Sequence, residues 1–305
     1  MNNTPAITTN NLTKNFGNFT AVNGINFTAK RGEIFGFLGP NGSGKTTTIR
    51  MMLGLLAPSS GDVHALGMPV KGNQAKLQGR IGYMSQRFSL YNDLTVQQNL
   101  QFYGAAYGLN NTDLKSRIQD ALVMAGLEGR ENAKTKDLSG GWRQRLALSA
   151  AILHHPELIF LDEPTAGVDP ISRRAFWNLL YELVSDGVTI FVTTHYMDEA
   201  EHCHNLAFIQ RGEIIARGSP AEIKKNMMLG QVLELVTSDA IKTLKILRAA
   251  NLAQEVELYG SLVHVVAPEI APKKIKKMLE KEKIDVEEMA IIEASLEDVF
   301  IASMK

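Results

Sequence analysis

Hydrophobic positions follow two different periods in the first part of this 305-residue chain. Polar and apolar side chains alternate over residues 7–16 and 20–28 around a Gly-Asn turn, which predicts an antiparallel β-hairpin. Residues 33–38 form a short apolar run that ends in a glycine-rich turn, and residues 46–56 carry apolar side chains at helical spacing. The pattern therefore predicts a hairpin that is followed by a strand and a helix.

Short apolar runs and amphipathic patterns alternate farther along the chain. The strand candidates are residues 158–161, 189–193 and 206–210, and helical patterns cover residues 142–154 and 171–186. Because strands that alternate with helices form parallel sheets, we expect an α/β fold. Residues 93–127 have the pattern of two helices without a strand, which predicts a helical insertion over about residues 87–157.

The last part of the chain predicts a separate, smaller arrangement. Its strand candidates are residues 231–237, 256–259, 262–267 and 286–293, and its helix candidates are residues 239–250, 270–284 and 296–304. The order β-α-β-β-α-β matches a split βαβ unit of the α+β, ferredoxin-like class. Ser238 and Ser295 stand where helix N-caps are expected.

The composition changes at the same place. Residues 1–220 hold 38 charged side chains, whereas the 85 residues after them hold 26, and 23 of the 25 glycines precede residue 221. Glycine-rich loops are typical of functional sites, and a dense mixture of charges is typical of a solvated surface. We therefore predict one domain over residues 1–220 and an accessory or regulatory domain over residues 221–305.

The overall charge excludes several classes of protein. Lys plus Arg and Asp plus Glu both number 32 and the pI is near 7.1, which argues against a broad basic face for nucleic acid or for a membrane surface. The single cysteine, Cys203, cannot form an internal disulfide. Because no signal peptide and no apolar run of about 18 residues is visible, we expect a cytoplasmic location.

The glycine-rich segment after the strand at residues 33–38 carries the first recognisable chemistry. Residues 39–46 fit the pattern G-x-x-x-x-G-K-S/T, with a helix predicted from residue 46 onward. Glycines permit the positive φ values that let backbone N–H groups converge on phosphate oxygens, and the helix N-terminus adds partial positive charge. Lys45 would reach the β- and γ-phosphates of a nucleotide, and Thr46 would ligate Mg²⁺.

Two carboxylates and a second possible anion site complete the chemistry. Asp162 follows the buried strand at residues 158–161 and is expected beside Mg²⁺, whereas Glu163 can orient or deprotonate an attacking water. Alone, Asp-Glu at a strand end is typical of solvated charges. The segment 138–141, Leu-Ser-Gly-Gly, opens a helix and could bind phosphate or act as a simple N-cap and turn.

These motifs, in this order, resemble the nucleotide-binding subunits of ABC transporters over residues 7 to about 220. The residues that carry the resemblance are 39–46, 138–141, 158–163, 166–169 and 194–195. Residues 82–86 and 94–100 are similar to the branch that serves ABC-2 type exporters of drugs, polysaccharides and lipids. Residues 295–300 resemble the end of the extra C-terminal domain of that branch.

The resemblance implies a P-loop ATPase cassette with an antiparallel β subdomain and a helical insertion, which binds ATP and Mg²⁺ in a head-to-tail dimer. The nucleotide-binding residues that it implies are Phe16 at the adenine, Gly39, Pro40, Asn41, Gly42, Ser43, Gly44, Lys45, Thr46 and Thr47 at the phosphates, and Ser139, Gly140, Gly141 and Asp169 from the opposite subunit. The implied catalytic residues are Glu163, His195 and Gln86, and the implied Mg²⁺ ligands are Thr46, Gln86 and Asp162.

Two residues depart from the family pattern. Phe16 stands where Tyr is more frequent, which keeps the aromatic ring and removes a hydroxyl. Trp142 stands at the fifth position of the 138–142 motif, where Gln is more frequent, so a polar contact from this position is in doubt.

Three further features leave alternatives open. Three consecutive residues, His202, Cys203 and His204, form a poor metal set because neighbours on a helix point in different directions. The aromatic residues of the insertion could receive a helix of a membrane subunit or pack in its core; they are Phe88, Tyr91, Phe102, Tyr103 and Tyr107. The lysine pairs at 273–274 and 276–277 are most simply the solvated face of a helix, with a lipid contact as the alternative.

The sequence thus predicts an ATPase that powers an ABC-2 type exporter from the cytoplasmic face of the membrane, through a permease partner and a second ATP-binding subunit. A soluble ABC ATPase that acts on DNA or ribosomes is the alternative, although such proteins usually have two cassettes or a coiled-coil insertion. A regulator that binds a small effector after residue 220 is a third hypothesis. The transported substrate and the permease cannot be inferred from this chain.

Overall fold

The computed structural model of the chain divides into two compact units. It describes residues 4–87, 89–227, 230–250, 252–267 and 271–303. The first unit is Met1–Arg217 and the second is Gly218–Lys305. Each unit has a hydrophobic core of its own and is described by itself.

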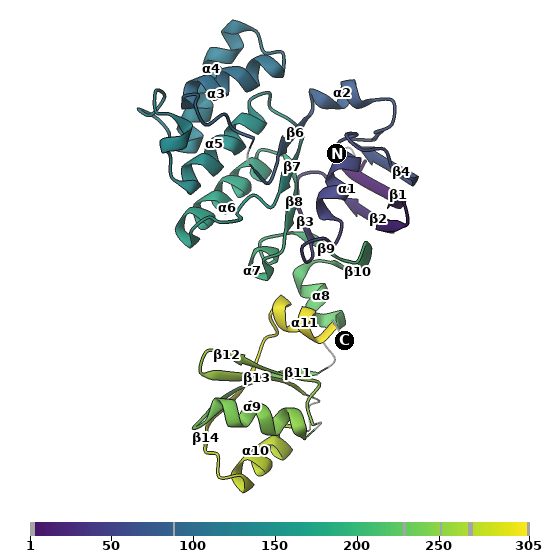
Figure 1. The fold of residues 1–305 in the computed structure, drawn as a ribbon, viewed down its shortest axis with the longest axis vertical. Coiled ribbons are helices and arrows are strands. Elements are labelled where there is room, and N and C mark those ends of the chain that lie inside the picture. The colour runs from purple at the N-terminus through teal and green to yellow at the C-terminus, as the bar shows by residue number, and fades with distance from the viewer. Residues whose placement is uncertain (1–3, 88, 228–229, 251, 268–270, 304–305) are drawn as a thin grey trace. The chain divides into compact units, whose positions relative to one another are not determined.

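A six-stranded sheet forms the centre of the first unit (Figure 1). Its order is β10-β9-β3-β8-β7-β6, and the five strands β9, β3, β8, β7 and β6 are parallel. Their bounds are β3 Ile34–Leu38, β6 Ile81–Met84, β7 Leu158–Asp162, β8 Thr189–Thr194, β9 Asn205–Gln210 and β10 Glu213–Gly218. Every residue of β3, β7 and β8 is buried, as expected for strands covered on both faces. The predicted parallel α/β sheet is confirmed.

An antiparallel sheet of order β2-β1-β4-β5 packs against the central sheet. The predicted hairpin is confirmed as β1 Ile7–Phe16 and β2 Phe19–Ala29, whereas β4 Ser60–Ala65, β5 Met68–Pro69 and helix α2 Gln74–Gln78 were not predicted. Rings from both sheets share one aromatic cluster, in which Phe27 lies 5.3 Å from Phe35 and 5.8 Å from Phe191 between ring centroids. This cluster joins the two sheets into one core.

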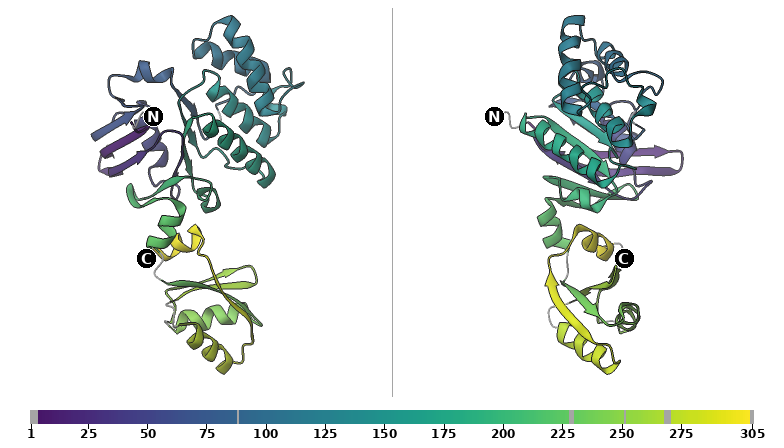
Figure 2. Two further views of the ribbon diagram at one scale, coloured as in Figure 1. Left: turned by 180° about the vertical axis from the view of Figure 1, so that it is seen from behind. Right: turned by 90° about the vertical axis from the view of Figure 1, so that its left-hand side faces the viewer.

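Helices α3, α4, α5 and α6 occupy the side of the first unit away from the antiparallel sheet, whereas α1 lies beside that sheet (Figures 1 and 2). The predicted insertion contains α3 Val96–Ala106 and α4 Asn111–Ala125, followed by the short 3₁₀ helix η1 Thr135–Asp137 and α5 Gly140–Ile152. Thr95 and Gln98 form a reciprocal capping box at the start of α3, and Asn110 caps α4. The remaining helices are α1 Lys45–Met52, α6 Pro170–Ser185 and α7 Met197–Ala200.

The second unit has the predicted ferredoxin-like order. Its antiparallel sheet runs β12-β13-β11-β14, with bounds β11 Gln231–Thr237, β12 Glu255–Tyr259, β13 Leu262–Ala267 and β14 Val286–Ile292. Helices α9 Ala240–Ala249 and α10 Ala271–Lys281 cover one face, and α8 Pro220–Met227 contacts α11 Leu296–Ser303 (Figure 1). Residue 270 and residue 304, the predicted ends of two helices, lie outside the described residues.

Local contacts in the second unit correct one predicted helix cap. They also support the prediction that the lysine pairs of α10 lie on a solvated helix face. Asp239 caps α9 by accepting a hydrogen bond from the Lys242 amide, so the prediction for Ser238 was wrong. Ser295 does accept from the Asp298 amide, as a cap should. Ile275 of α10 is fully buried, and the four lysines at 273–274 and 276–277 are exposed, which agrees with a solvated helix face.

Candidate functional site

The loop between β3 and α1 has the backbone expected of a phosphate cradle. Gly42 and Gly44 have φ values of 80° and 110°, in the left-handed region that favours glycine. A Cβ on Gly39 would lie 2.1 Å from the carbonyl oxygen of Ile209, and one on Gly44 would lie 2.6 Å from that of Ala21. The loop therefore requires glycine at positions 39 and 44 for steric reasons.

Lys45 opens α1 with its ammonium group turned back into the loop. The residue is 4% exposed, and its Nζ lies 2.8 Å from the Gly39 carbonyl oxygen and 3.2 Å from that of Pro40. Its Nζ also lies 3.0 Å from Oε1 of Glu163, which is itself 7% exposed. A buried ammonium and a buried carboxylate thus compensate each other.

Glu163 lies where three predicted site residues meet. Its Oε2 accepts a hydrogen bond from Nε2 of Gln86 at 3.1 Å and lies 3.3 Å from Nδ1 of His195. The backbone φ of Glu163 is 48°, an uncommon value for a residue with a side chain, and its amide donates to both oxygens of Thr193. The structure therefore gathers Lys45, Glu163, Gln86 and His195 at the carboxyl edge of the central sheet.

Asp162, the other predicted carboxylate, is fixed by the neighbouring strand. It is 1% exposed, and its Oδ1 accepts a hydrogen bond of 2.7 Å from the Thr193 hydroxyl. Thr193 is the register partner of Asp162 between β7 and β8. Burial and then the charge of Asp162 raise the pKa of Tyr83 to about 12. Sequence reasoning missed Thr193, whose only signal was a polar residue at the end of an apolar run.

A cavity of about 490 Å³ opens at this edge of the sheet. Its lining residues are Phe16, Phe19, Ala21, Asn41, Gly42, Gly44, Lys45, Thr46, Thr47, Gln86 and Glu163. Phe16 and Phe19 face each other across the β1–β2 turn and are 50% and 63% exposed. Phe19 was not predicted, although its place directly after the turn, opposite Phe16, was the signal.

Ser139, Gly140, Gly141 and Asp169 do not line the cavity at Lys45. A Cβ on Gly141 would lie 2.3 Å from Oγ of Ser172, so the start of α5 packs closely on the first turn of α6. Asp169 caps α6 by accepting a 3.0 Å hydrogen bond from the Ser172 amide, and this bond lowers the pKa of Asp169. Ser139 is exposed and its side chain makes no cap hydrogen bond to α5.

Trp142 is held by stacking instead of by the polar contact that Gln could make. The guanidinium carbon of Arg130 lies 3.4 Å from the Trp142 ring centroid, and that of Arg145 lies 5.9 Å away. Two residues later, Gln144 is fully buried and donates a 2.8 Å hydrogen bond to the carbonyl of Pro164. The helix that starts at the 139–141 segment is therefore tied directly to the segment that follows Glu163.

The residues at 202–204 have separate structural roles. His202 stacks on Trp177 with ring centroids 4.8 Å apart, and His204 accepts a hydrogen bond from the Ile34 amide through Nδ1. Cys203 is 5% exposed, and burial raises the pKa of its thiol. Across the part of the chain that the structure describes, no group of three His, Cys, Asp or Glu residues is suited to hold a metal.

The aromatic residues of the insertion divide into two pairs. Tyr103 donates to a backbone carbonyl and Tyr107 stacks on a histidine ring, so both pack within the unit. Tyr91 and Phe102 are 47% and 45% exposed, and their rings meet edge to face with centroids 4.7 Å apart. Phe88 lies outside the described residues.

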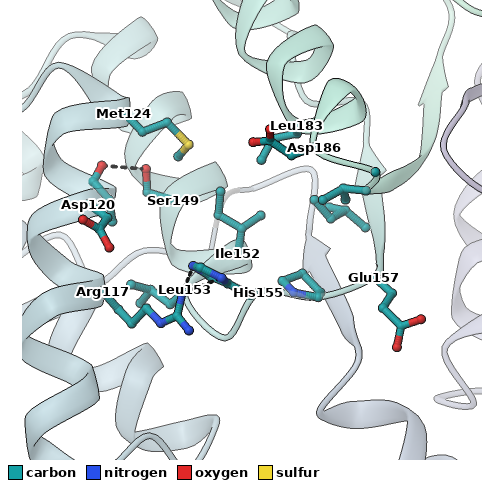
Figure 3. A pocket seen from close by; sticks show the side chains of 15 residues that line it. Arg117, Asp120, Met124, Ser149, Ile152, Leu153, His155, Glu157, Leu183 and Asp186 are labelled. Carbon is teal, nitrogen blue, oxygen red and sulfur yellow. Dashed lines mark hydrogen bonds between the residues drawn. The ribbon is translucent and has the colours of Figure 1, made fainter.

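A second cavity, of about 460 Å³, lies between α4, α5 and the end of α6 (Figure 3). Met124, Ile152 and Leu183 contribute apolar surface, and Arg117 and Asp120 are among its charged residues. The lining contains none of the predicted site residues. The cavity beside Lys45 is therefore the candidate functional site.

The chain is similar to several known proteins. Residues 22–166 match the family model described as "ABC transporter". Over 88% of its length, the chain is 38% identical to Nod factor export ATP-binding protein I of Ralstonia nicotianae, of which it covers 84%. The chain belongs to the ABC transporter family. The ATP-binding domains of this family hydrolyse ATP to power transport.

Two more relatives of this ABC protein extend the comparison. One is the probable multidrug ABC transporter ATP-binding protein YbhF of Escherichia coli (strain K12), which is 49% identical over 70% of this chain. The matched part of this chain spans only 37% of the length of YbhF. A dimeric ATP-binding cassette, MJ0796, solved in a post-hydrolysis state with ADP and Pi, has a TM-score of 0.64 and 28% identity. That alignment covers 70% of this chain and 98% of the cassette.

The residues around the cavity have the chemistry that a nucleotide with Mg²⁺ would require. A Cβ on Gly42 would meet nothing within 4 Å, so the loop is open at that residue, and the buried Ser43 hydroxyl has no hydrogen-bond partner among the described residues. Thr46 and Asp162 supply oxygen atoms, which Mg²⁺ prefers, and phosphate oxygens commonly complete such sites.

The described helices include none that is long and apolar enough to cross a bilayer.

Proposed function

We propose that this chain is the ATP-hydrolysing subunit of an ABC-2 type exporter and that it works as a head-to-tail dimer. The observation that carries the proposal is the placement of the Glu163 carboxylate, which contacts Lys45, Gln86 and His195 at the mouth of the phosphate loop. A general base must lie within reach of the water that it deprotonates, and this carboxylate lies at the edge of the cavity.

Nucleotide binding rearranges the pair of buried charges. The γ-phosphate competes with Glu163 and with two loop carbonyls for the Lys45 ammonium, and its greater negative charge favours the exchange. Glu163 is then free to accept a proton from a water molecule. The water oxygen bonds to the γ-phosphorus, the bond from that phosphorus to the β-phosphate oxygen breaks, and ADP and phosphate are the products.

The remaining residues bind and orient. Thr46, Asp162 and Gln86 would hold Mg²⁺, which supplies neutralisation of the charge that develops on the phosphate oxygens. The His195 side chain is 31% exposed, enough to contact a γ-phosphate, and Phe16 would stack on adenine. The N–H groups of residues 42–46 and the N-terminus of α1 stabilise the β-phosphate.

Replacing the catalytic carboxylate tests this mechanism. Glu163→Gln keeps the size of the side chain and removes the base, so kcat should fall by about 10²- to 10⁴-fold. Binding of ATP, measured by fluorescence titration of a labelled analogue, should remain. The exposed residue Glu182→Gln, on the outer part of α6, provides the control and should leave turnover unchanged. Turnover of the Glu163 variant at the wild-type rate would refute the assignment.

The dimer accounts for Ser139, Gly140, Gly141 and Asp169. Within one chain they lie away from the Lys45 cavity, and Ser139 is exposed with no cap bond to α5. A second subunit in head-to-tail arrangement would place them over its partner's nucleotide. Ser139→Phe should therefore abolish hydrolysis and leave ATP binding to the separate subunit intact. The control, Ser185→Phe at the end of α6, should leave both hydrolysis and ATP binding unchanged. Loss of binding alone in the Ser139 variant would contradict a role in the opposite site.

An export role rests on the relatives and on one surface. The relatives at 49% and 38% identity are named for multidrug transport and Nod factor export, which disfavours action on DNA or ribosomes. The exposed ring pair Tyr91 and Phe102 offers apolar contacts to a permease helix. A polytopic partner should co-purify with the wild-type chain and not with Tyr91→Ser/Phe102→Ser. ATPase activity that responds to DNA or ribosomes would oppose the proposal.

The proposed accessory domain over residues 221–305 corresponds to the second unit. We assign it a role in dimer stability or regulation. Its own core and its ferredoxin-like sheet support an accessory domain that is independent of the ATP site. Removing residues 221–305 should weaken dimerisation, measured by analytical ultracentrifugation with ATP in the Glu163→Gln background. Unchanged dimerisation together with unchanged transport would remove this assignment.

A further inference from the structure

We infer that Arg173 is a positioning residue that holds His195 in its working orientation and ties it to the loop that carries Asp169. The inference deepens the proposed function and rests on it. Arg173 lies in the first turn of α6, four residues after the Asp169 cap. It does not line the Lys45 cavity, so its influence must pass through other residues.

The guanidinium group of Arg173 contacts three residues of the segment that follows His195. One of its terminal nitrogens donates a 3.2 Å hydrogen bond to Oδ2 of Asp198, and its Nε lies 3.6 Å from Oε1 of Glu199. The guanidinium carbon also lies 4.4 Å from the ring centroid of Tyr196. A planar, forked cation is suited to stack on a ring and reach two carboxylates at once, which an ammonium group is not.

Tyr196 transmits this contact to the candidate site. Its ring packs against that of His195 with centroids 4.2 Å apart and the ring planes tilted by 34°, and Nδ1 of His195 lies 3.3 Å from Oε2 of Glu163. Arg173 is thus separated from His195 by one ring. The imidazole is held on one side by Tyr196 and faces the catalytic carboxylate through Nδ1.

A second link joins the same two segments. The Thr165 hydroxyl donates to Oε1 of Glu199, whose side chain is 1% exposed and relies on Thr165 and Arg173 for compensation. Thr165 belongs to the stretch between Glu163 and Asp169. The 163–169 stretch, the first turn of α6 and the short helix α7 are therefore bonded to one another as a group.

The linkage has a consequence for the reaction. In the proposed dimer, Asp169 faces the opposite subunit, so dimer closure acts on the start of α6. Because Arg173 joins that start to Tyr196, closure would bring His195 into line with the γ-phosphate. Misplacing a catalytic group by about 1 Å can cost about 10²-fold in rate. Arg173 should therefore affect turnover much more than it affects binding of ATP.

Conservative variants separate this role from a purely structural one. Arg173→Lys keeps a charge for Asp198 and Glu199 and loses the planar stack, and Tyr196→Leu keeps an apolar side chain and loses the ring. Arg174→Ala is the matched control, because Arg174 is the next residue on α6 and is exposed. For each full-length variant we would measure kcat, the Kd for ATP and the thermal unfolding midpoint.

The expected result is a split between turnover and binding. Arg173→Lys and Tyr196→Leu should each lower kcat by about 10- to 100-fold, with the Kd for ATP and the unfolding midpoint close to wild type. The double variant should be no slower than the slower single variant, because both changes break one chain of contacts. Arg174→Ala should match the wild type.

Three results would overturn the inference. Wild-type turnover of Arg173→Lys would show that charge alone suffices. Rate losses that multiply in the double variant would show that the two residues act separately, and a kcat that falls only with the folded fraction would show a purely structural role. If Glu163→Gln silences the enzyme while Arg173→Lys does not, only this inference fails. If the wild type lacks Glu163-dependent turnover, the proposed function fails as well.

Discussion

At the scale of single residues, Thr193 fixes both carboxylates of the candidate site. Its hydroxyl donates to Asp162 and accepts from the Glu163 amide, while its carbonyl accepts from the same amide. These bonds hold Glu163 at a φ of 48°, a conformation that a residue with a side chain adopts only when its surroundings enforce it. The position of the catalytic oxygen atoms therefore depends on a side chain from the neighbouring strand.

Replacing this hydroxyl should affect both stability and turnover. Thr193→Val keeps the shape and leaves Asp162 and the Glu163 amide with a bond fewer, which should lower the unfolding free energy by about 1–3 kcal/mol and also lower kcat. Thr189→Val, at the far end of the same strand, removes one part-buried hydrogen bond from the Gly32 amide and serves as the control. Urea unfolding should show a loss of stability for both variants, and steady-state assays should show a rate loss for Thr193→Val alone. Equal rates in both variants would contradict the positioning role.

Sequence reasoning reached the residues whose chemistry is local and missed those that depend on pairing across the sheet. The pattern over residues 39–46 predicts its own turn, because the glycines and Lys45 act on neighbouring backbone. Asp162 and Glu163 were predicted from the apolar run before them. Thr193 is defined by its register opposite Asp162, which depends on strand order and cannot be counted along the chain.

At the scale of elements, helix α5 carries the exposed Ser139 segment and depends on a stacked pair for its orientation. Trp142 in its first turn is covered by the guanidinium of Arg130, from the stretch after α4, at 3.4 Å. The contact between Arg130 and Trp142 thus connects the stretch after α4 to the first turn of α5, which carries the segment that is proposed to face a second nucleotide. Gln144 adds a buried bond to the Pro164 carbonyl, next to Glu163.

A double-mutant cycle tests whether this stack contributes to the unfolding free energy. Trp142→Leu and Arg130→Met, alone and together, should give a coupling energy of about 0.5–2 kcal/mol in urea unfolding. Arg145 lies 5.9 Å from the same ring, so its coupling with Trp142 should be smaller and serves as the comparison. A zero coupling for Arg130 would show that the contact does not stabilise α5.

The elements that the sequence pattern missed are short; besides β6, β10, α7 and α8 they include three that are only partly buried. Strands β4 and β5 and helix α2 have few apolar residues at regular spacing, and their place is set by pairing with β1 and by packing on the core. The ferredoxin-like unit was predictable because each of its strands and helices shows a clear period. The cap of α9 shifted by one residue because Asp239, next to Ser238, reaches the Lys242 amide.

At the scale of the whole first unit, the two ends of the parallel strands in the central sheet have different roles. The candidate site lies at the carboxyl ends of the parallel strands. At their amino ends, one carboxylate links the starts of three strands. Glu157 pairs with Arg31 at 2.9 Å and with Arg80 at 2.6 Å, and these three residues precede β7, β3 and β6. These two ion pairs keep the first residues of β7, β3 and β6 in register, at the end of the sheet opposite the phosphate loop.

These ion pairs predict how the stability of the protein depends on pH. The hydrogen bond from Arg80, with that from Arg31, lowers the pKa of Glu157 below its ordinary value of 4.5. A carboxylate whose pKa is lower in the folded state contributes stability above the unfolded pKa and loses it as pH falls through the folded pKa. The Glu157 side chain is 43% exposed, so solvent screening limits the effect to about 1 kcal/mol.

Glu157→Gln removes the titrating group and should flatten the dependence of stability on pH. Below pH 4.5 the wild type should lose unfolding free energy faster than this variant, whereas near pH 7 the variant should be the less stable of the two. Asp93→Asn is the control, because the Asp93 side chain is 91% exposed and lies 3.6 Å from its lysine partner. Urea unfolding from pH 3.5 to 7 compares the three proteins. Parallel pH curves for the wild type and Glu157→Gln would mean that the two arginines do not stabilise the ionised carboxylate, and the register of the three strands would then rest on backbone pairing alone.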